Sequence, residues 1–408
     1  MTARAPWGPG ESFLLPEILE LARQGNELTV LPLRPGRRLA AGAEAALVAT
    51  LGVSLPLLGR AVIVRALLQM ARRPRAAMRL LWTLATTSGG VVKAMKNLAV
   101  LPKGLSLAWE CQRRRVEHIH AHWASTPSTA AYVAAAWTGL PWSVTAHRWD
   151  IAENNMLREK ARTAAFVRAI SQRGAHELRA VLPRHHWGKV RVIHVGVRIQ
   201  PPVTSAPFGV ATAPGGGGVP AIASVGNLIP LKGHAYLIEA CAKLKGRNIA
   251  VHCHIFGDGP LRLALERLAK ELGVDCLIDF HGQVPHDQLL AHFAMGAFSF
   301  VVHPSIETPK GEKEGIPVAL MEAMASGIPV ISTPTGSIAE LLGDGAGIMV
   351  PPQDADALAS AIEGLLQSSR RRAKLAGRAR ELIEGSFLLS SVSRQLSDAM
   401  AGETCGRG

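Results

Sequence analysis

Residues 303–342 read HPSIETPKGEKEGIPVALMEAMASGIPVISTPTGSIAELL, and this stretch decides the fold class. An apolar segment ends at His303, a polar loop follows, and Pro317 opens a run of Val, Ala, Leu and Met that predicts a helix over 317–326. Proline is favoured at the first position of a helix. The apolar residues 329–332 then predict a strand. Strand, helix and strand in this order are typical of a parallel α/β domain.

The same alternation extends along the chain on both sides of this stretch. In the second half it predicts strands at 221–225, 250–255, 277–280, 298–302, 329–332 and 347–350, with helices at 233–245, 260–272, 286–294, 317–326 and 355–367. In the first half it predicts strands at 116–120, 142–145, 166–170 and 190–194, with a helix at 127–138. Short apolar strands between longer amphipathic segments predict an α/β fold class with two Rossmann-like domains.

The domain organisation follows from length and composition. A chain of 408 residues exceeds what one ordinary hydrophobic core supports. Residues 199–220 are rich in Pro, Gly and Ala and carry no charge, which is typical of a linker. We therefore predict an N-terminal domain at 1–200, a linker at 201–219 and a C-terminal domain at 220–385. The tail, 386–408, is expected to pack back on the N-terminal domain.

Basic residues concentrate in the first half of the chain. Residues 1–200 hold 28 Lys and Arg against 11 Asp and Glu, a balance of +17, and residues 201–408 hold 17 against 20, a balance of −3. A basic surface suits nucleic acid, anionic lipid or an anionic substrate. Aromatic residues make up only 5%, and no nucleic-acid-binding motif accompanies the charge, so we expect no nucleic acid partner.

The sequence predicts a cytoplasmic protein. Five scattered cysteines without a C-x-x-C pair indicate reduced thiols, no signal peptide is evident, and the apolar stretch 47–59 is too short to span a bilayer. Residues 60–79 interleave arginines with Leu, Val, Ile and Met. This pattern is typical of an interfacial helix, which would hold the protein peripherally on the inner face of the plasma membrane. It is equally typical of a solvated helix face or of a surface for an acidic partner protein.

Two carboxylates stand at the predicted helix over 317–326. Glu322 lies in the middle of an apolar helix, and Glu314 lies eight residues earlier in the preceding loop. The helix N-terminus offers free N–H groups to a phosphate. Helical side chains lean toward the N-terminus, so both carboxylates are expected to flank one ligand and accept hydrogen bonds from its hydroxyls. Alternatively, Glu314 is a solvated loop charge and Glu322 is paired with a neighbour for structural reasons.

The stretch from Glu314 to Glu322 resembles the E-x7-E signature of retaining glycosyltransferase family 4, which has the GT-B fold of two Rossmann-like domains facing across a cleft. Residues 224–233, SVGNLIPLKG, and 257–260, GDGP, resemble further elements of that family. The resemblance implies that Lys232 binds the donor diphosphate, Glu322 the ribose and Glu314 the transferred sugar. Asn227 departs from the pattern, because the family usually has an arginine there.

The first half resembles the exopolysaccharide-type members of the same family. The pieces are 118–123, HIHAHW, and 143–151, SVTAHRWDI, and the resemblance implies that His147 contacts the donor sugar near the reaction centre. The opening 7–13, WGPGESF, resembles the family's first glycine-rich loop, although only six residues precede it for a strand. His118, His120 and His122 share one strand face, where packing and lining of the site are a better interpretation than a metal.

We expect no metal and no cofactor besides the co-substrate. The single D-x-D, Asp354 to Asp356, follows two prolines and opens a helix, so a helix cap is the better interpretation. A diphosphate neutralised by Lys232 and helix amides requires no metal.

The resulting prediction is an enzyme, a retaining hexosyltransferase (a glycosyltransferase) that moves a hexose from a nucleoside diphosphate sugar to a glycan or lipid-linked acceptor in exopolysaccharide or cell-surface glycan synthesis. Two alternatives remain: transfer to a soluble small molecule, or a catalytically silent scaffold that binds nucleotide sugar, which Asn227 favours. The predicted catalytic residues are His147 and Glu314. The predicted donor-binding residues are Lys232, Asn227, Gly226, Gly257, Glu314, Gly315, Ile316, Pro317, Val318 and Glu322, and the predicted acceptor-side residues are Gly8, Gly10, His122 and Asp150.

Overall fold

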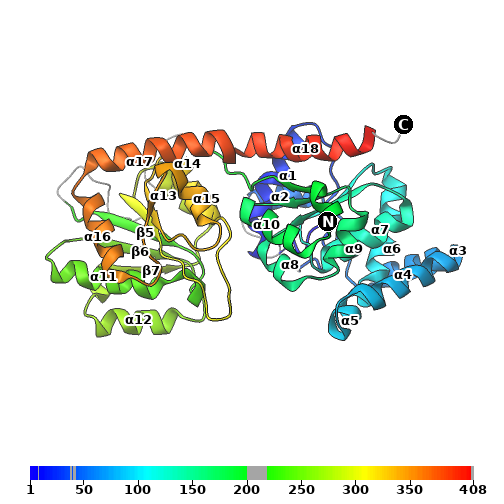
Figure 1. Ribbon diagram of the computed structural model, residues 1–408, viewed down its shortest axis with the longest axis horizontal. Coiled ribbons are helices and arrows are strands. Elements are labelled where there is room, and N and C mark those ends of the chain that lie inside the picture. Colours follow the sequence, from blue (N-terminus) through cyan, green and yellow to red (C-terminus); the bar gives the residue numbers. More distant parts are fainter. Residues whose placement is uncertain (8, 37–38, 40–42, 200–217, 406–408) are drawn as a thin grey trace. The chain divides into compact units, whose positions relative to one another are not determined.

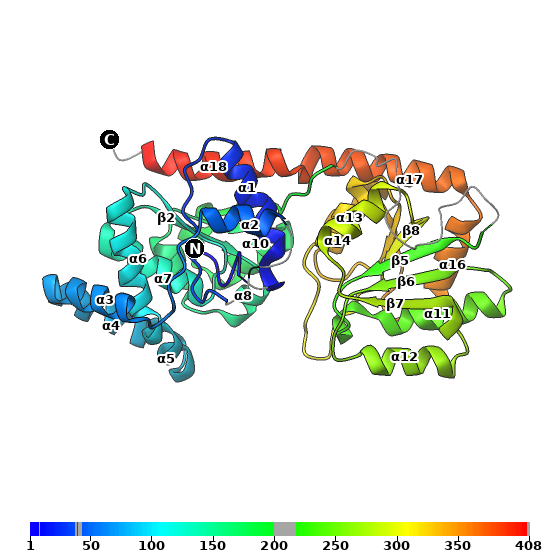
Figure 2. The ribbon, with the colours of Figure 1, turned by 180° about the vertical axis from the view of Figure 1, so that it is seen from behind.

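The computed structural model describes residues 1–7, 9–36, 39, 43–199 and 218–405, and the chain forms two compact units (Figure 1). Unit 1 comprises Met1–Val195 and Leu389–Gly408, and unit 2 comprises Gly196–Leu388. Each unit has a parallel sheet flanked by helices (Figure 2). The linker predicted at 201–219 lies almost entirely outside the described residues.

Unit 2 contains a six-stranded parallel sheet in the order β10-β9-β8-β5-β6-β7. Its strands are β5 (Ala221–Val225), β6 (His252–Phe256), β7 (Ile278–Gly282), β8 (Phe300–His303), β9 (Val330–Ser332) and β10 (Ile348–Met349). Its helices are α11 (His234–Gly246), α12 (Arg262–Glu271), α13 (His286–Ala294), α14 (Val318–Ala325), α15 (Ile338–Leu342), α16 (Ala355–Leu366) and α17 (Ser369–Leu382). Each strand and helix predicted for the second half is present, with boundaries shifted by a few residues.

The strand order of unit 2 creates a switch point between β5 and β8. From β5 the chain winds outward through β6 to β7, and it then returns to the other side of β5 and winds through β8 to β10. Helices α11, α12 and α16 cover one face of the sheet and α13 and α14 the other (Figures 1 and 2). In open α/β sheets, ligands bind at the carboxyl ends of the strands beside such a switch point.

Unit 1 contains the parallel sheet β1-β2-β3-β4. Its strands are β1 (Ile119–Ala121), β2 (Trp142–Ala146), β3 (Phe166–Ala169) and β4 (Val190–Val192). Met1 and Thr2 extend the sheet beside β1, because His122 N–H donates to Met1 O at 3.0 Å and Thr2 N–H donates to Leu31 O at 3.2 Å. In the segment before the glycine-rich loop, Thr2 forms an isolated parallel bridge with Pro32.

The predicted strand at 116–120 is wrong in its first half. Val116 N–H donates to Cys111 O at 2.9 Å, which closes the C-terminus of α6 (Leu101–Arg114), so the strand begins only at Ile119. The remaining helices of unit 1 are α1 (Leu15–Arg23), α2 (Ala43–Thr50), α3 (Arg60–Arg72), α4 (Pro74–Thr87), α5 (Val91–Ala99), α7 (Thr126–Thr138), α8 (Arg148–Glu153), α9 (Leu157–Thr163), α10 (Gln172–Val181) and α18 (Leu389–Cys405).

Residues 60–79 form parts of two helices, which corrects the expectation of a single one. Helix α3 ends at Arg72 and α4 begins at Pro74. A proline lacks the N–H that would continue the helix, and it disfavours helical backbone at the residue before it. Arg73 accordingly has φ −138° and ψ 66°. The basic segment thus consists of two consecutive helices that meet at Arg73.

The C-terminal helix α18 belongs to unit 1. It packs along α1, and Figures 1 and 2 both show the two helices side by side. Val392 and Leu396 of α18 join Leu21 of α1 and Phe166 of β3 in one buried apolar cluster. Burial of these side chains attaches the end of the chain to the first unit.

Candidate functional site

Two glycines bring the loops after β5 and β6 into contact at the carboxyl end of the unit 2 sheet. Gly257 has φ +132°, and a Cβ at this position would lie 2.1 Å from Gly226 O. Both the backbone conformation and the close approach therefore exclude a side chain. A Cβ at Gly226 would lie 3.3 Å from the aliphatic stem of Lys232. The two predicted glycines thus make room for Lys232 at the switch point.

Lys232 and Glu314 form an ion pair at this point. Lys232 ends a short 3₁₀ turn after β5, whereas Glu314 lies in the loop after β8. Lys232 Nζ donates to Glu314 Oε1 at 3.0 Å, and the two side chains are 16% and 11% exposed. Ser305 Oγ donates to Glu314 Oε2 at 3.4 Å. The structure therefore brings together the two residues predicted for diphosphate and sugar.

Glu314 is negatively charged throughout the physiological pH range. Burial alone would raise the pKa of its carboxyl, but the neighbouring His303 and the charge of Lys232 outweigh burial and lower the pKa to about 2. His303 Nε2 lies 3.9 Å from Glu314 Oε2, and burial lowers the pKa of this ring as well. Unit 2 therefore holds a buried, fixed carboxylate whose cationic partner is half-buried.

The loop of Glu314 continues into the N-terminus of α14. Gly315 and Ile316 are half-buried, Pro317 is the N-cap, and the first intrahelical bonds run from Leu320 N–H and Met321 N–H to Pro317 O. The amide of Val318 precedes these bonds and, together with the helix dipole, suits an anion. The predicted phosphate-binding segment is thus a helix N-terminus, as expected.

Glu322 lies one turn into α14, and its side chain is 10% exposed. His286, the first residue of α13, places its Nε2 2.6 Å from Glu322 Oε1. This pairing explains how an apolar helix tolerates a carboxylate. It also places an imidazole ring next to Glu322, the residue predicted to bind the ribose. That role of Glu322 stays a prediction.

The turn after β9 supports Glu314 through its backbone. Gly336 has φ +60°, a Cβ there would lie 1.8 Å from Glu314 O, and Ser337 N–H donates to the same oxygen at 3.2 Å. Ser337 therefore supports Glu314 through its backbone amide. Asn227, which departs from the family's arginine, is exposed after β5.

In unit 1, His147 lies directly after β2 as the N-cap of α8. Its ring centroid is 4.3 Å from that of Trp123 and 5.7 Å from that of Phe13. Burial lowers the pKa of the ring to about 3, and the neighbouring His122 and Arg168 act in the same direction. Within the described part of the chain, His147 Nε2 is a buried atom without a hydrogen-bond partner. The ring is thus neutral, and this nitrogen can bond to a ligand hydroxyl.

A buried ion pair lies near the histidines of β1. Arg168 of β3 donates to both carboxylate oxygens of Glu17 of α1, at 2.9 and 2.7 Å. His122 Nδ1 lies 3.8 Å from Glu17 Oε1, and burial lowers the pKa of His122 to about 4. Breaking a buried pair of this kind leaves an uncompensated charge, so Glu17 and Arg168 anchor α1 to the sheet.

Of the remaining acceptor-side predictions, Asp150 lies in α8, shortly after the end of β2. Asp150 accepts from His147 N–H at 3.0 Å, and burial raises its pKa to about 6. Lys160 is buried and donates to Ala124 O at 2.7 Å, and burial lowers its pKa to about 7. Gly8 lies outside the described residues, and Gly10 lies in the 3₁₀ segment Pro9–Leu14, where its surroundings are not described.

Neither metal candidate weighed in the sequence forms a metal-binding group in the described residues. His118 Nε2 and His120 Nδ1 each bond to Ser143 Oγ at 2.7 Å, which is strand packing. Asp354 Oδ1 accepts from Ala357 N–H at 2.8 Å as the cap of α16, and Asp356 pairs with a surface lysine.

Sequence reasoning missed several residues around these positions. They share one property, which is that each lies at or just after the carboxyl end of a strand or pairs with a predicted residue from a distant helix. A polar residue directly after a predicted strand is the signal that could have found His303 and Ser305. The residues missed are His286, His303, Ser305, Glu17, Lys160 and Arg168.

Comparison with known proteins identifies the second unit. Residues 216–382 match the family "Glycosyl transferases group 1". The "Putative colanic acid biosynthesis glycosyltransferase WcaL" of Escherichia coli (strain K12) is 36% identical over 181 residues, which cover 44% of each chain. A "GDP-mannose-dependent alpha-(1-6)-phosphatidylinositol monomannoside mannosyltransferase" of Mycolicibacterium smegmatis is 30% identical over 184 residues, 45% of this chain and 48% of that protein. The alignments thus span less than half of these curated relatives.

Solved structures extend the likeness over both units. A glycosyltransferase from Rickettsia africae ESF-5 superposes with a TM-score of 0.70 at 16% identity, covering 100% of this chain and 98% of that one. Anabaena Alr3699/HepE in complex with UDP superposes with a TM-score of 0.67 at 18% identity, covering 98% of both chains. At these identities the likeness shows the fold. Residues 216–382 therefore match the glycosyl transferases group 1 family, in a chain with the two-domain fold of GT-B glycosyltransferases.

Proposed function

We propose that this protein is a retaining, metal-independent hexosyltransferase of glycosyltransferase family 4, which uses a nucleoside diphosphate sugar and acts in exopolysaccharide or cell-surface glycan synthesis. The observation that carries the proposal is the Lys232–Glu314 pair beside Gly226 and Gly257 at the switch point of unit 2. A positive side chain, a helix N-terminus and two buried carboxylates meet the needs of a diphosphate, a ribose and a sugar. Of the relatives named above, one is named for colanic acid biosynthesis and the other for its dependence on GDP-mannose, which supports the same class.

In the proposed reaction, unit 2 stabilises the leaving nucleoside diphosphate. The acceptor oxygen bonds to the anomeric carbon on the face from which the phosphate leaves, the bond from that carbon to the phosphate oxygen breaks, and the acceptor proton passes to the departing phosphate. Lys232 and the amides of 316–318 are placed to offset the developing charge. Glu314 accepts from sugar hydroxyls and Glu322 from ribose hydroxyls. The neutral His147 of unit 1 keeps its own predicted role, a hydrogen bond between its Nε2 and a ligand hydroxyl.

Nucleotide binding by the full chain tests the donor assignment. A ligand that binds only the folded state raises the melting temperature in proportion to ln(1 + [L]/Kd), so UDP, GDP and ADP can be ranked in one thermal-shift series. One diphosphate should raise the melting temperature, and the cognate sugar nucleotide should raise it further. Absence of a shift with all three nucleotides, and with their sugar conjugates, would refute the proposal.

A pair of lysine variants locates the binding site. Lys232→Ala should weaken nucleotide binding by about 10- to 100-fold, because a charge-assisted hydrogen bond contributes about 1.5–3 kcal/mol. Lys232→Arg should lose less, since it keeps the charge. Lys243→Ala is the matched control, because Lys243 lies in the same unit and pairs with Asp356 at 2.9 Å. Equal affinities for all three variants and the wild type would place the donor site elsewhere.

The acceptor side of the proposal is a lipid-linked glycan at an anionic membrane surface. Helices α3, α4 and α5 expose apolar side chains that a soluble surface helix would normally bury, and Figures 1 and 2 show these helices at the margin of unit 1, away from its sheet. More than half of the strongly exposed large hydrophobic side chains in the described residues fall between 58 and 95. They are Leu58, Val64, Leu67, Leu68, Met78, Trp82, Val91, Val92 and Met95.

Arginines lie beside this apolar surface, as is typical of helices that bind at a membrane interface. Arg65 is committed to Glu110 at 2.8 Å, and Arg73 donates to Trp137 O at 3.1 Å. The other four arginines of α3 and α4 are exposed, and each contributes about 1 kcal/mol to the free energy of binding when it lies near an anionic bilayer. Among the described residues, no helix is long and apolar enough to span a bilayer. A protein indifferent to vesicles would favour the soluble acceptor, and nucleotide binding without turnover on any acceptor would favour the scaffold.

A further inference from the structure

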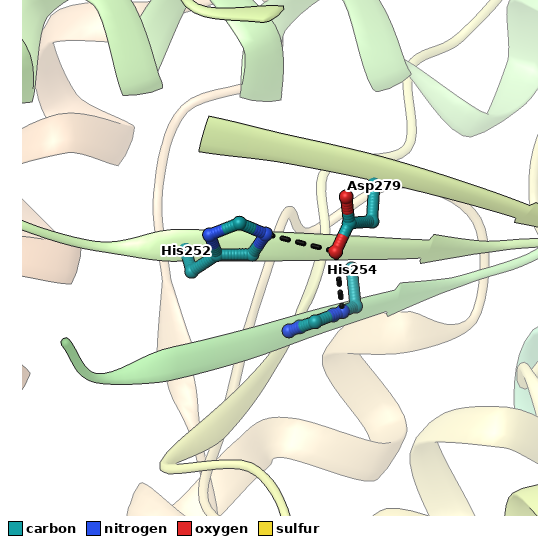
Figure 3. Close-up of side chains that lie close together, drawn as sticks. All are labelled: His252, His254 and Asp279. Carbon is teal, nitrogen blue, oxygen red and sulfur yellow. Dashed lines mark hydrogen bonds and ion pairs between the residues drawn. The ribbon is translucent and has the colours of Figure 1, made fainter. Parts of the chain in front are cut away.

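A second cluster of ligand-type side chains lies on the β6–β7 edge of the unit 2 sheet. His252 and His254 project from the same face of β6, because alternate residues of a strand share a face. Asp279 of β7 is the register partner of His254. Figure 3 shows the two imidazole rings and the carboxylate pointing toward one another. The three side chains come from adjacent strands of a rigid sheet, so their arrangement does not depend on a loop.

The distances in this cluster match those of a metal site. Asp279 Oδ2 lies 2.9 Å from His252 Nε2 and 3.5 Å from His254 Nδ1, and the potential ligand atoms of all three residues lie within 4.8 Å of one another. With bonds of about 2.0–2.1 Å, the ligand atoms of a tetrahedral Zn²⁺ are roughly 3.3 Å apart. Two of the three separations already bracket that value. A ring rotation that brings His252 and His254 closer would complete the geometry.

Two further histidines lie beside this group. His254 is buried, and His281 of β7 places its Nε2 2.9 Å from His254 Nδ1. In the described residues, His292 Nδ1 of α13 is a buried atom without a hydrogen-bond partner. The cluster therefore lies in a region of the sheet that is rich in imidazole nitrogen atoms.

A bound cation would engage the lone pairs of both imidazoles and of the carboxylate at once. Imidazole and carboxylate together suit Zn²⁺ and its neighbours in the first transition row, whereas Ca²⁺ and Mg²⁺ prefer oxygen ligands.

We propose that His252, His254 and Asp279 bind a structural transition-metal dication, Zn²⁺ in the first instance. The cation would join β7, the edge strand of the sheet, to β6. The loop with Gly257 follows the carboxyl end of β6, and His254, the proposed ligand nearest to that loop, lies three residues before Gly257. At about 3.3 Å per residue, His254 and Gly257 are on the order of 10 Å apart. Donor turnover therefore does not pass through this cation.

The test is metal binding by the untagged full chain after removal of metals with EDTA and gel filtration. Titration with Zn²⁺ against a chromophoric chelator should show one tight equivalent per chain, and the melting temperature should rise with Zn²⁺. Co²⁺ should give the visible absorption bands of a tetrahedral site. Failure to bind Zn²⁺ above the level of the chelator blank would overturn the proposal.

Matched variants assign the site. Asp279 and His252 have partly exposed side chains, at 53% and 31%, so Asp279→Asn and His252→Ala should fold. Each should weaken Zn²⁺ binding more than tenfold and abolish the Co²⁺ bands. The control is the double variant of His185 and His186 to alanine, which removes a surface histidine pair in unit 1 with ring centroids 4.1 Å apart. Zn²⁺ affinity unchanged in Asp279→Asn and His252→Ala, or lost in the control instead, would contradict the assignment.

Discussion

Replacing Glu314 by glutamine should make the free energy of unfolding of unit 2 less dependent on pH in the acid range. The folded protein lowers the pKa of this carboxyl from 4.5 to about 2, through His303 and Lys232 and against the effect of burial. A lowered folded pKa stabilises the protein at pH values above 4.5, and that contribution is lost as the pH falls toward 2. A shift of this size corresponds to about 3 kcal/mol at neutral pH, of which roughly 1.4 kcal/mol is gone by pH 3.5. Glutamine has no such titration.

The measurement is urea unfolding of wild type and Glu314→Gln between pH 7 and pH 3.5. All eight tryptophans lie in unit 1, so tryptophan fluorescence follows that unit, and far-ultraviolet circular dichroism adds the transition of unit 2. The stability difference between the two proteins should shrink by about 1–1.5 kcal/mol over this range, and the fluorescence transition should stay unchanged.

The matched control is Glu307→Gln, because Glu307 lies in the same loop and pairs with Lys313 at 2.6 Å with a 49% exposed side chain. An exposed pair of this kind contributes little, so the control should follow the wild type at every pH. Parallel pH curves for wild type and Glu314→Gln would refute the argument that Lys232 and His303 hold Glu314 ionised.

Three further outcomes follow from the site and the surface. Glu322→Ala should weaken nucleotide binding about 10- to 100-fold, as measured by calorimetry, whereas Glu363→Ala on α16 should not weaken it. Unchanged nucleotide binding by a folded Glu322→Ala protein would contradict the assignment of Glu322 to the ribose. Turnover should survive EDTA, and a loss restored by manganese or magnesium would contradict metal independence. Co-sedimentation of the protein with vesicles should rise with the content of anionic lipid and fall with salt. It should weaken when the four exposed arginines of α3 and α4 (Arg60, Arg72, Arg75 and Arg79) become glutamine, whereas the same change at four exposed basic residues of α17 (Arg370, Arg371, Lys374 and Arg380) should have no effect. Equal binding to neutral and anionic vesicles would oppose the electrostatic part of the proposal.

Local patterns predicted most elements of both sheets. The strands of unit 2 and helix α14 could be located because hydrophobic periodicity and terminal residues report on neighbours a few positions away. Asp354 is the cap of α16 for the same reason, since its side chain reaches only three residues along the chain. The errors are also local. Val116 belongs to the end of α6 and does not begin a strand. Pro74 divides residues 60–79 into two helices, although their composition predicted one.

The sequence by itself determined the fold class and the positions of Lys232, Glu314 and Glu322, because each lies at a fixed offset from a strand or helix that its own neighbours specify. Only the tertiary structure decided which side chains meet. Lys232 and Glu314, 82 residues apart, pair because the strand order places the carboxyl ends of β5 and β8 side by side. His286 reaches Glu322 from the start of α13, and Asp279 reaches His252 and His254 because β6 and β7 pair in one particular register. Strand order and register are set by burial of the whole sheet, and a one-residue slip of β7 against β6 would turn Asp279 to the opposite face from His252 and His254.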